Sequence, residues 1–284
     1  MTDTAWVADV GGTWTRCAVV DRLGAIRAEH RVQTAGLPDP PDTWVALADT
    51  WRTLTTEPPV GVAIALPARI AADGCVTFIP NVPSWAGSNP VTGLANAVGR
   101  PADALQDAQA GLRGEAWMGR DVPASFYFMA IGTGIGGAYQ VDGHPVRGDH
   151  NLAGIPASVL PGRHIEDVAS GRAVAAALDV PSGEAALALA RTGDPAALAA
   201  FAIAADALRG VVAVITGLLD VSEVRVGGGF GTAAFDLLFP TQALPERYWT
   251  YPPVHADVRI RPSDTADQAQ LLGLAATVFT PDHL

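Results

Sequence analysis

The sequence has few cysteines and few basic residues, and each scarcity excludes a class of protein. Its 284 residues include 2 cysteines, Cys17 and Cys75. Two are too few for a disulfide framework, so we expect reduced thiols and a cytoplasmic protein. Lys and Arg number 18 against 29 Asp and Glu, the net charge is −11, and no basic run is present. We therefore expect no binding to nucleic acid or to an anionic membrane, because both require clustered cations.

The sequence also lacks the usual marks of a secreted or membrane-anchored protein. The segment before the first expected strand carries Asp3 and no basic stretch, unlike a signal peptide. We expect no membrane span, on the view that no apolar run approaches the ~20 residues that a span needs. Hydrophobic residues make up 49% of the chain, enough to bury a core in one large domain or two lobes.

Two segments share one pattern of apolar strand, glycine-rich turn and second apolar strand. The first spans residues 6–20 with its turn at Gly11, and the second spans 126–139 with its turn at Gly132. Each pattern is typical of a β-hairpin with an enlarged turn. This weak internal duplication predicts two lobes of related topology.

The rest of the chain alternates between strand and helix patterns, which predicts an α/β fold. The last helix is expected to be capped by Asp264 or Thr265. The expected helices are 41–54, one after 107, 169–178, 183–191, 195–219, 232–238 and 266–278, and the expected strands include 60–66, 76–79, 223–226 and 258–260.

The strongest local signal is the turn of the first hairpin, which reads DVGGTWTR. Gly11 and Gly12 let backbone N–H groups approach phosphate oxygens with no Cβ in the way. Asp9, at the end of a buried strand, is a candidate Mg²⁺ ligand, directly or through water. Thr13 and Arg16 are candidate donors to phosphate. A tight hairpin turn with no ligand explains the same residues and stays open as an alternative.

Two further glycine-rich turns are candidate nucleotide-binding loops. No helix follows the turn at 132–137, so its G-x-G spacing does not fit a dinucleotide-binding motif. The turn at 227–231 lies between a strand and a helix, so the helix amino terminus can face a nucleotide. A simple packing turn explains either one alone. The candidate residues in the two turns are Gly132, Thr133, Gly134, Gly136, Gly228 and Gly229.

In this order the three turns resemble the first phosphate, second phosphate and adenosine loops of sugar kinases of the ROK family (repressor, open reading frame, kinase). Residues 81–85, NVPSW, and 169–173, ASGRA, also resemble family segments, so the resemblance covers most of the chain. It implies a two-lobed actin/hexokinase-type (ribonuclease H-like) fold with an active-site cleft between lobes. The implied lobes are residues 1–105 and 106–265, with a helix in 266–284 packing back on the first.

The resemblance implies an ATP- and Mg²⁺-dependent kinase that phosphorylates a hexose. The expected acceptor is the 6-hydroxyl, and the expected assembly is a homodimer. Asp107 matches the family's catalytic base, and phosphoryl transfer needs such an acceptor for the hydroxyl proton. Gln106 replaces an Asn that contacts the sugar, and Asn81 matches another sugar-side residue. The alternative for Asp107 is a plain helix cap.

The sequence departs from the family at its zinc motif. Residues 153–158 read AGIPAS where the family has Ala-Gly-Glu-x-Gly-His, and the cysteine cluster is missing, so we expect no zinc. Glu166 matches a sugar-contacting Glu. His150, Asn151 and His164 are candidates to replace the lost contacts, with ordinary loop residues as the alternative.

The lost contacts indicate that the preferred sugar has changed, because an unpaired buried polar group costs ~1–3 kcal/mol. Kinases for amino-modified glucoses of antibiotic pathways, such as kanosamine (3-amino-3-deoxyglucose), are one candidate class, with glucokinases and N-acetylhexosamine kinases as alternatives. A sugar-sensing regulator without a DNA-binding domain and an actin-like or heat-shock-like ATPase are further hypotheses. A helix-turn-helix is not expected, since the first strand begins by about Ala5.

Overall fold

The computed structural model describes residues 3–157, 162–249 and 251–280. Within these residues the chain forms two compact units. Unit 1 holds the residues up to Gly119, the segment Arg147–Ala153 and the residues from Gln268 on. Unit 2 holds Arg120–Val146 and Gly154–Asp267.

Unit 1 is built on a five-stranded sheet in the order β3-β2-β1-β4-β7. The strands β1, β2 and β3 are antiparallel neighbours, and β4 and β7 run parallel to β1. This arrangement confirms the first expected hairpin. The strands are β1 (Thr4–Val10), β2 (Trp14–Asp21), β3 (Ile26–Gln33), β4 (Gly61–Leu66) and β7 (Ala102–Gln106), with β5 (Arg69–Ile70) and β6 (Val76–Phe78) forming a separate two-stranded sheet.

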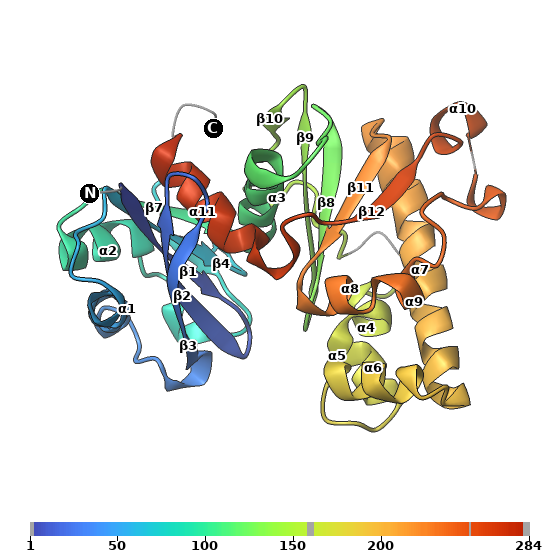
Figure 1. The fold of residues 1–284 in the computed structure, drawn as a ribbon, viewed down its shortest axis with the longest axis horizontal. Helices are drawn as coiled ribbons and strands as arrows, with labels where there is room; N and C mark the ends of the chain where they lie inside the picture. The colour runs from blue at the N-terminus through green and yellow to red at the C-terminus, as the bar shows by residue number, and fades with distance from the viewer. Residues whose placement is uncertain (1–2, 158–161, 250, 281–284) are drawn as a thin grey trace. The chain divides into compact units, whose positions relative to one another are not determined.

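The two faces of this sheet pack against different helices. Trp6 and its neighbours at alternate positions form one core with α1 (Asp42–Leu54) and α2 (Pro90–Val98), and Val7 lies in the core on the other face. There α3 (Asp107–Met118) packs against α11 (Ala269–Phe279), as Figure 1 shows in green and red. Because α3 packs on α11, the compact unit extends to Gly119, past the boundary expected at residue 105.

Helices α3 and α11 approach each other through glycines. A Cβ placed on Gly114 would lie 1.9 Å from the carbonyl oxygen of Ala269, and one on Gly273 would lie 1.7 Å from that of Ala110. No side chain fits at either position, because such separations are far below contact distance. The closing helix therefore packs within unit 1, as the resemblance implies.

Unit 2 repeats the topology of unit 1. Its sheet has the order β10-β9-β8-β11-β12, in which β8, β9 and β10 are antiparallel neighbours and β11 and β12 run parallel to β8. The duplicated hairpin pattern therefore predicted a duplicated sheet correctly. The strands are β8 (Phe126–Ile131), β9 (Ile135–Val141), β10 (His144–Pro145), β11 (Glu223–Gly227) and β12 (Arg259–Pro262).

One face of the second sheet is covered by helices, chief among them α7 (Pro195–Leu219). Asp194 caps α7 by accepting from the amide of Ala197, and Pro195 stands in its first turn. The other helices of unit 2 are α4 (Glu166–Ala169), α5 (Gly171–Ala177), α6 (Gly183–Arg191), α8 (Gly229–Ala233), α9 (Phe235–Leu238) and α10 (Pro252–His255), and the chain's 3-10 turns are η1 (Thr34–Gly36), η2 (Pro83–Trp85), η3 (Glu246–Tyr248) and η4 (Ala266–Gln268).

Helix α7 corrects the expectation that no apolar run is long enough to span a membrane. It has 25 residues and a mean hydropathy of 2.0 in its most apolar window, and it alone among the described helices passes that test of length and composition. Asp206 and Arg209 interrupt the apolar run, but the mean hydropathy stays high enough for the helix to pass this test. Half of the window is buried inside the protein, as in the core helix of a globular domain.

Two local expectations were wrong. The helix expected over 232–238 is two short helices, α8 and α9, separated at Ala234. The expected capping of the last helix by Asp264 or Thr265 does not occur, because α11 begins only at Ala269, after η4. Asp264 instead accepts hydrogen bonds from the guanidinium of Arg225 at 2.9 Å and from the amide of Arg120 at 2.8 Å.

Candidate active site

The first glycine turn is a short, braced connection between β1 and β2. The amide of Gly11 donates to the carbonyl of Trp14 at 2.9 Å, and a Cβ on Gly11 would lie 2.9 Å from the same oxygen. Thr34, which is buried, donates from its hydroxyl to the carbonyl of Gly11 at 2.9 Å and from its amide to that of Thr13 at 3.0 Å. The turn is therefore held from the end of β3, and Thr13 itself is exposed.

Asp9 and Arg16 face each other across the hairpin, one residue pair away from this turn. Burial raises the pKa of Asp9 to about 6, the positive charge of Arg16 lowers it and the charge of Glu29 raises it. Arg16 donates to Glu29 from Nε at 3.0 Å and from Nη2 at 3.1 Å, and this pairing lowers the pKa of Glu29. Glu29 therefore orients the guanidinium that the sequence assigns to phosphate, and that assignment stays a prediction.

Asp9 fits the role of a magnesium ligand in one respect. A carboxylate whose pKa is raised by burial is stabilised by a nearby cation, and hard cations prefer carboxylate oxygen. In the described part of the chain, no three His, Cys, Asp or Glu side chains gather into a group that could hold a metal ion. A Mg²⁺ ion at Asp9 would therefore need the nucleotide phosphates and water as its other ligands.

Asn81 lies against the same turn. The Asn81 amide nitrogen is 3.2 Å from the position that a Cβ would take on Gly12. The residue assigned to the sugar and the turn assigned to phosphate thus lie side by side within unit 1.

Asp107 begins α3 at the carboxyl end of β7. Its Oδ1 atom accepts from the amide of Ala108 at 2.8 Å and from the side-chain amide of Gln106. Gln106 is buried and also caps α3, because its Oε1 accepts from the amide of Gln109 at 3.0 Å. The cap that was the alternative role of Asp107 thus belongs to Gln106. The orientation of the Asp107 carboxylate is fixed by two donors.

His150 and Asn151 lie in the segment Arg147–Ala153, which belongs to unit 1. Nδ1 of His150 lies 2.8 Å from Nη2 of Arg69, and the side-chain amide of Asn151 donates to the carbonyl of Ile70 at 2.8 Å. Asn151 has a φ of 56°, a conformation that Asn adopts more readily than most residues. This segment is therefore docked on β5.

In unit 2 the second and third glycine turns meet. Gly228 has a φ of 80°, and a Cβ there would lie 2.6 Å from the carbonyl oxygen of Ile131, the last residue of β8. The amide of Gly132 closes the second turn onto Gly134 at 2.9 Å, and the carbonyl of Gly132 accepts from Gly171 at 2.8 Å. Thr133 at the tip is exposed, Gly136 lies in β9 opposite Ala130, and Gly229 begins α8.

The model of the ROK family matches residues 6–280 of the chain. The protein belongs to the ROK family. Among its relatives it is 29% identical to the N-acetylmannosamine kinase of Escherichia coli (strain 55989 / EAEC) over 294 residues, 96% of this chain and 97% of that protein. It is 28% identical over 250 residues to the bifunctional enzyme NanE/NanK of Brucella melitensis biotype 1, a match that covers 79% of this chain and 45% of that protein's length.

Among solved structures, the ROK family glucokinase of Streptomyces griseus, in complex with glucose and AMPPNP, superposes with a TM-score of 0.83. It is 23% identical, with 96% of this chain and 98% of that chain covered. The expected hexokinase-type fold of the ROK kinases is thereby confirmed.

Glu166 lies in a different unit from the other residues assigned to the sugar in this ROK protein. It begins α4 in unit 2, and its Oε2 atom would lie 2.3 Å from a Cβ on Gly134. The other such residues, Asn81, Gln106, Asp107, His150 and Asn151, lie in unit 1. Glu166 therefore stands beside the second phosphate turn, and its contact with a sugar stays a prediction.

Two further side chains are placed by the structure. Trp85, the last residue of the segment 81–85 that resembles the family, is 1% exposed and packs edge-on against Trp44 with ring centroids 5.4 Å apart, so it belongs to the core. His164 is exposed. Thr34 and Arg69 were not foreseen, because neither lies near its partner in sequence and no ROK motif quoted above includes them.

Proposed function

We propose that this ROK protein is an ATP-dependent sugar kinase that transfers the γ-phosphate to a hexose hydroxyl, the 6-hydroxyl in the first instance. The observation that carries the proposal is the grouping within unit 1. Asp107 is held by two donors at the start of α3, and Asn81 lies against the glycine turn flanked by Asp9 and Arg16. The relatives reported above, an N-acetylmannosamine kinase and a glucokinase, support the same reaction class.

Asp107 acts as the general base in this proposal. Oδ1 is oriented by Ala108 and Gln106, so the carboxylate is positioned to accept the proton of the attacking hydroxyl. The glycine turns supply backbone N–H groups to the phosphates. Magnesium, held by Asp9 together with the phosphates, would supply charge neutralisation on the transferred group.

The substrate class is a glucose-like hexose. Kanosamine is one candidate, and an N-acetylhexosamine or glucose itself is the alternative. Arg69 contacts His150 in the segment assigned to the sugar, and a cation there would repel the ammonium group of kanosamine. A neutral hydroxyl or acetamido group meets no such repulsion, so Arg69 favours the alternatives over kanosamine.

A coupled assay of ADP release tests the proposal. We expect turnover to require a sugar, in a panel of glucose, mannose, N-acetylglucosamine, N-acetylmannosamine, glucosamine and kanosamine, and NMR of the product identifies the phosphorylated oxygen. ATP hydrolysis that no sugar accelerates contradicts the kinase proposal and favours a conformational ATPase. Sugar binding without any turnover favours a regulator.

The family resemblance alone supports two further proposals, a homodimer and a cytoplasmic location. Light scattering on the eluting peak of a gel-filtration column tests the first.

A further inference from the structure

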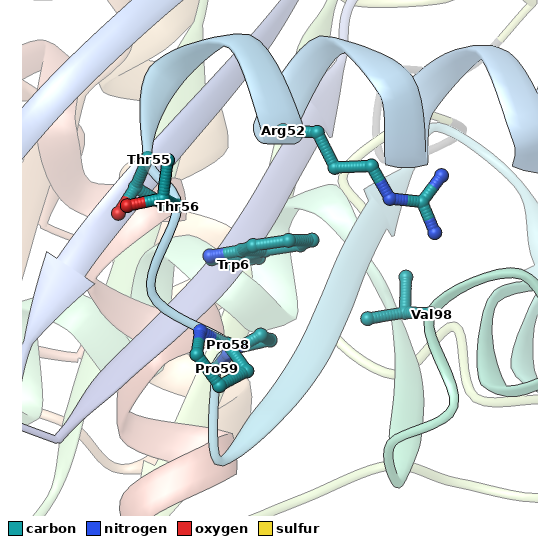
Figure 2. A pocket seen from close by; sticks show the side chains of 7 residues that line it. All are labelled: Trp6, Arg52, Thr55, Thr56, Pro58, Pro59 and Val98. Atoms are coloured by element: carbon teal, nitrogen blue, oxygen red, sulfur yellow. The ribbon is translucent and has the colours of Figure 1, made fainter.

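A pocket of about 400 Å³ opens in unit 1, away from the residues described above. Figure 2 shows it between β1, the carboxyl end of α1 and the connection from α1 to β4. The pocket lies near the amino-terminal edge of the parallel strands β1 and β4, whereas Asp9 and Asp107 lie at carboxyl ends of strands. Trp6, which lines it, precedes Asp9 by three residues, or about 10 Å along the strand.

Trp6, whose side chain lines the pocket, has a buried hydrogen-bond donor with no partner among the described residues. Trp6 is 5% exposed, and its indole nitrogen is buried without a hydrogen bond. Its neighbour Trp51, tilted by 31° with ring centroids 5.9 Å apart, instead donates to the carbonyl of Val7 at 3.1 Å. Buried N–H groups are nearly always paired, so an orphan at a cavity wall points to an acceptor that fills the cavity.

The neighbours of the indole nitrogen are two threonines and two prolines. In Figure 2 the nitrogen lies at the end of the ring flanked by Thr55 and Thr56 on one side and by Pro58 and Pro59 on the other. The Thr55 hydroxyl oxygen accepts from the amide of Glu57 at 3.1 Å, so its hydrogen is available to a ligand. The prolines supply an apolar wall.

Arg52 supplies positive charge at the pocket wall. Nη1 of Arg52 contacts Asp49 at 2.7 Å and Nη2 donates to the carbonyl of Ala97 at 2.9 Å, so the guanidinium is fixed in place. Other N–H groups of this side chain remain, and arginine has no acceptor. None of the 7 described lining residues carries a carboxylate.

We propose that this pocket binds a small organic anion, a phosphate ester or a carboxylate of metabolite size. An oxygen of the anion accepts from the indole N–H of Trp6, its charge faces Arg52, and its carbon frame packs against Pro58 and Pro59. The volume is within the range of ligand pockets, and such pockets combine apolar walls with a few fixed polar groups. The proposal goes beyond the sugar kinase reaction and does not depend on it.

Indole resonances in ¹⁵N NMR spectra test the proposal. The Trp6 signal is assigned by its loss in Trp6→Phe, and the whole protein is titrated with glucose 6-phosphate, with pyruvate and with glucose as a neutral probe. We expect a saturable shift of the Trp6 signal with at least one of the two anions and none with glucose. Arg52→Gln should weaken that binding about tenfold, the usual loss for one charge-assisted hydrogen bond.

The matched control is Arg247→Gln, which removes an exposed arginine of unit 2 and should leave the titration unchanged. A Trp6 signal that no anion moves at millimolar concentration overturns the proposal. The proposal is also overturned if the Trp6 signal of Arg52→Gln shifts with the same titration midpoint as that of the unaltered protein, or if glucose shifts the Trp6 signal. Binding at the proposed sugar site would instead move other signals and persist in Arg52→Gln. Because Arg52 lies at the rim, this variant tests the pocket even if Trp6→Phe fails to fold.

Discussion

The two five-stranded sheets have the same strand order and directions, yet their glycine turns offer different chemistry. Next to the turn, the hairpin of unit 1 pairs Asp9 with Arg16, and the hairpin of unit 2 pairs Ala130 with Gly136 at the corresponding position. The first hairpin thus carries a charged pair of its own, whereas the carboxylate beside the second turn, that of Glu166, comes from α4. One topology therefore presents two glycine turns with different side chains around them.

The supports of the two turns differ in the same way. Thr34 holds the first through its side chain, whereas the amide of Gly171 holds the second through the carbonyl of Gly132. Substitutions can therefore test the support of the first turn by removing a side-chain group, whereas they test the backbone of the second by adding atoms.

Asp107→Asn should reduce the rate of phosphoryl transfer by at least ~100-fold and leave nucleotide affinity nearly unchanged, because a positioned base acts only in the transition state. Transfer is measured by ADP release and nucleotide affinity by calorimetry. Asp103→Asn is the matched control, since Asp103 lies in β7, the strand that leads into Asp107, and its pKa is raised by burial. Undiminished transfer by Asp107→Asn would remove this side chain from the mechanism.

Gly228→Ala should lower the free energy of unfolding by several kcal/mol, whereas Gly132→Ala should leave it nearly unchanged. The first adds a Cβ at positive φ, 2.6 Å from the backbone of Ile131, and the second meets no atom within 4 Å. Urea unfolding measures both. If Gly132→Ala also weakens nucleotide binding while folding normally, the second turn acts through its backbone. Equal stability of the two variants would show that Gly228 is not constrained as described.

Asp9 should make binding of the magnesium nucleotide depend on pH near 6. Its pKa is raised from 3.8 to about 6, so the folded protein keeps a proton there that the unfolded chain has lost. Asp9 thus contributes stability below pH 4 that is lost as pH rises through 6. A metal needs the carboxylate, so affinity should fall about tenfold per pH unit below 6.

Calorimetry in buffers of different ionisation enthalpy, with Asp9→Asn as the control, checks this dependence. The variant should bind the magnesium nucleotide more weakly and without a pH step near 6. An unchanged step in the variant would assign the titration to another group.

Thr34→Val should lower the free energy of unfolding by about 1–3 kcal/mol, because it removes the bond to Gly11 and a hydrogen bond of 3.0 Å to Thr15. Thermal unfolding measures the change. Thr192→Val, at an exposed helix end, is the control and should have almost no effect. A nucleotide affinity that falls more than stability would show that the brace also sets the geometry of the first turn.

Local signals in the sequence predicted much of the fold. Helix α7 has the expected bounds because Asp194 and Pro195 mark its start at the level of sequence. The cap of α11 was predicted wrongly because Asp264 is taken by Arg225, a contact 39 residues distant that no local pattern contains.

In the candidate site, too, local features were predicted from the sequence and long-range contacts were not. The three turns were predicted, because close approach at Gly11 and positive φ at Gly228 favour glycine, while their contacts with a nucleotide stay a prediction. The partners Thr34, Glu29 and Arg69 were not assigned, since each is brought to its contact by strand pairing or loop docking. The burial of Trp85 likewise depends on its contact with Trp44, which is distant in the sequence.

The packing of α11 against α3 has a consequence for synthesis of the protein on the ribosome. The wall behind Asp107 includes Gly273, more than 160 positions later in the chain, and α11 also completes the core around Val7. Unit 1 therefore stays unfinished until residues 269–279 have emerged, while nearly all of unit 2 is already available to fold. The first-made half of the protein must wait for the last-made helix, and chains stalled before it should expose the apolar face of the first sheet to chaperones.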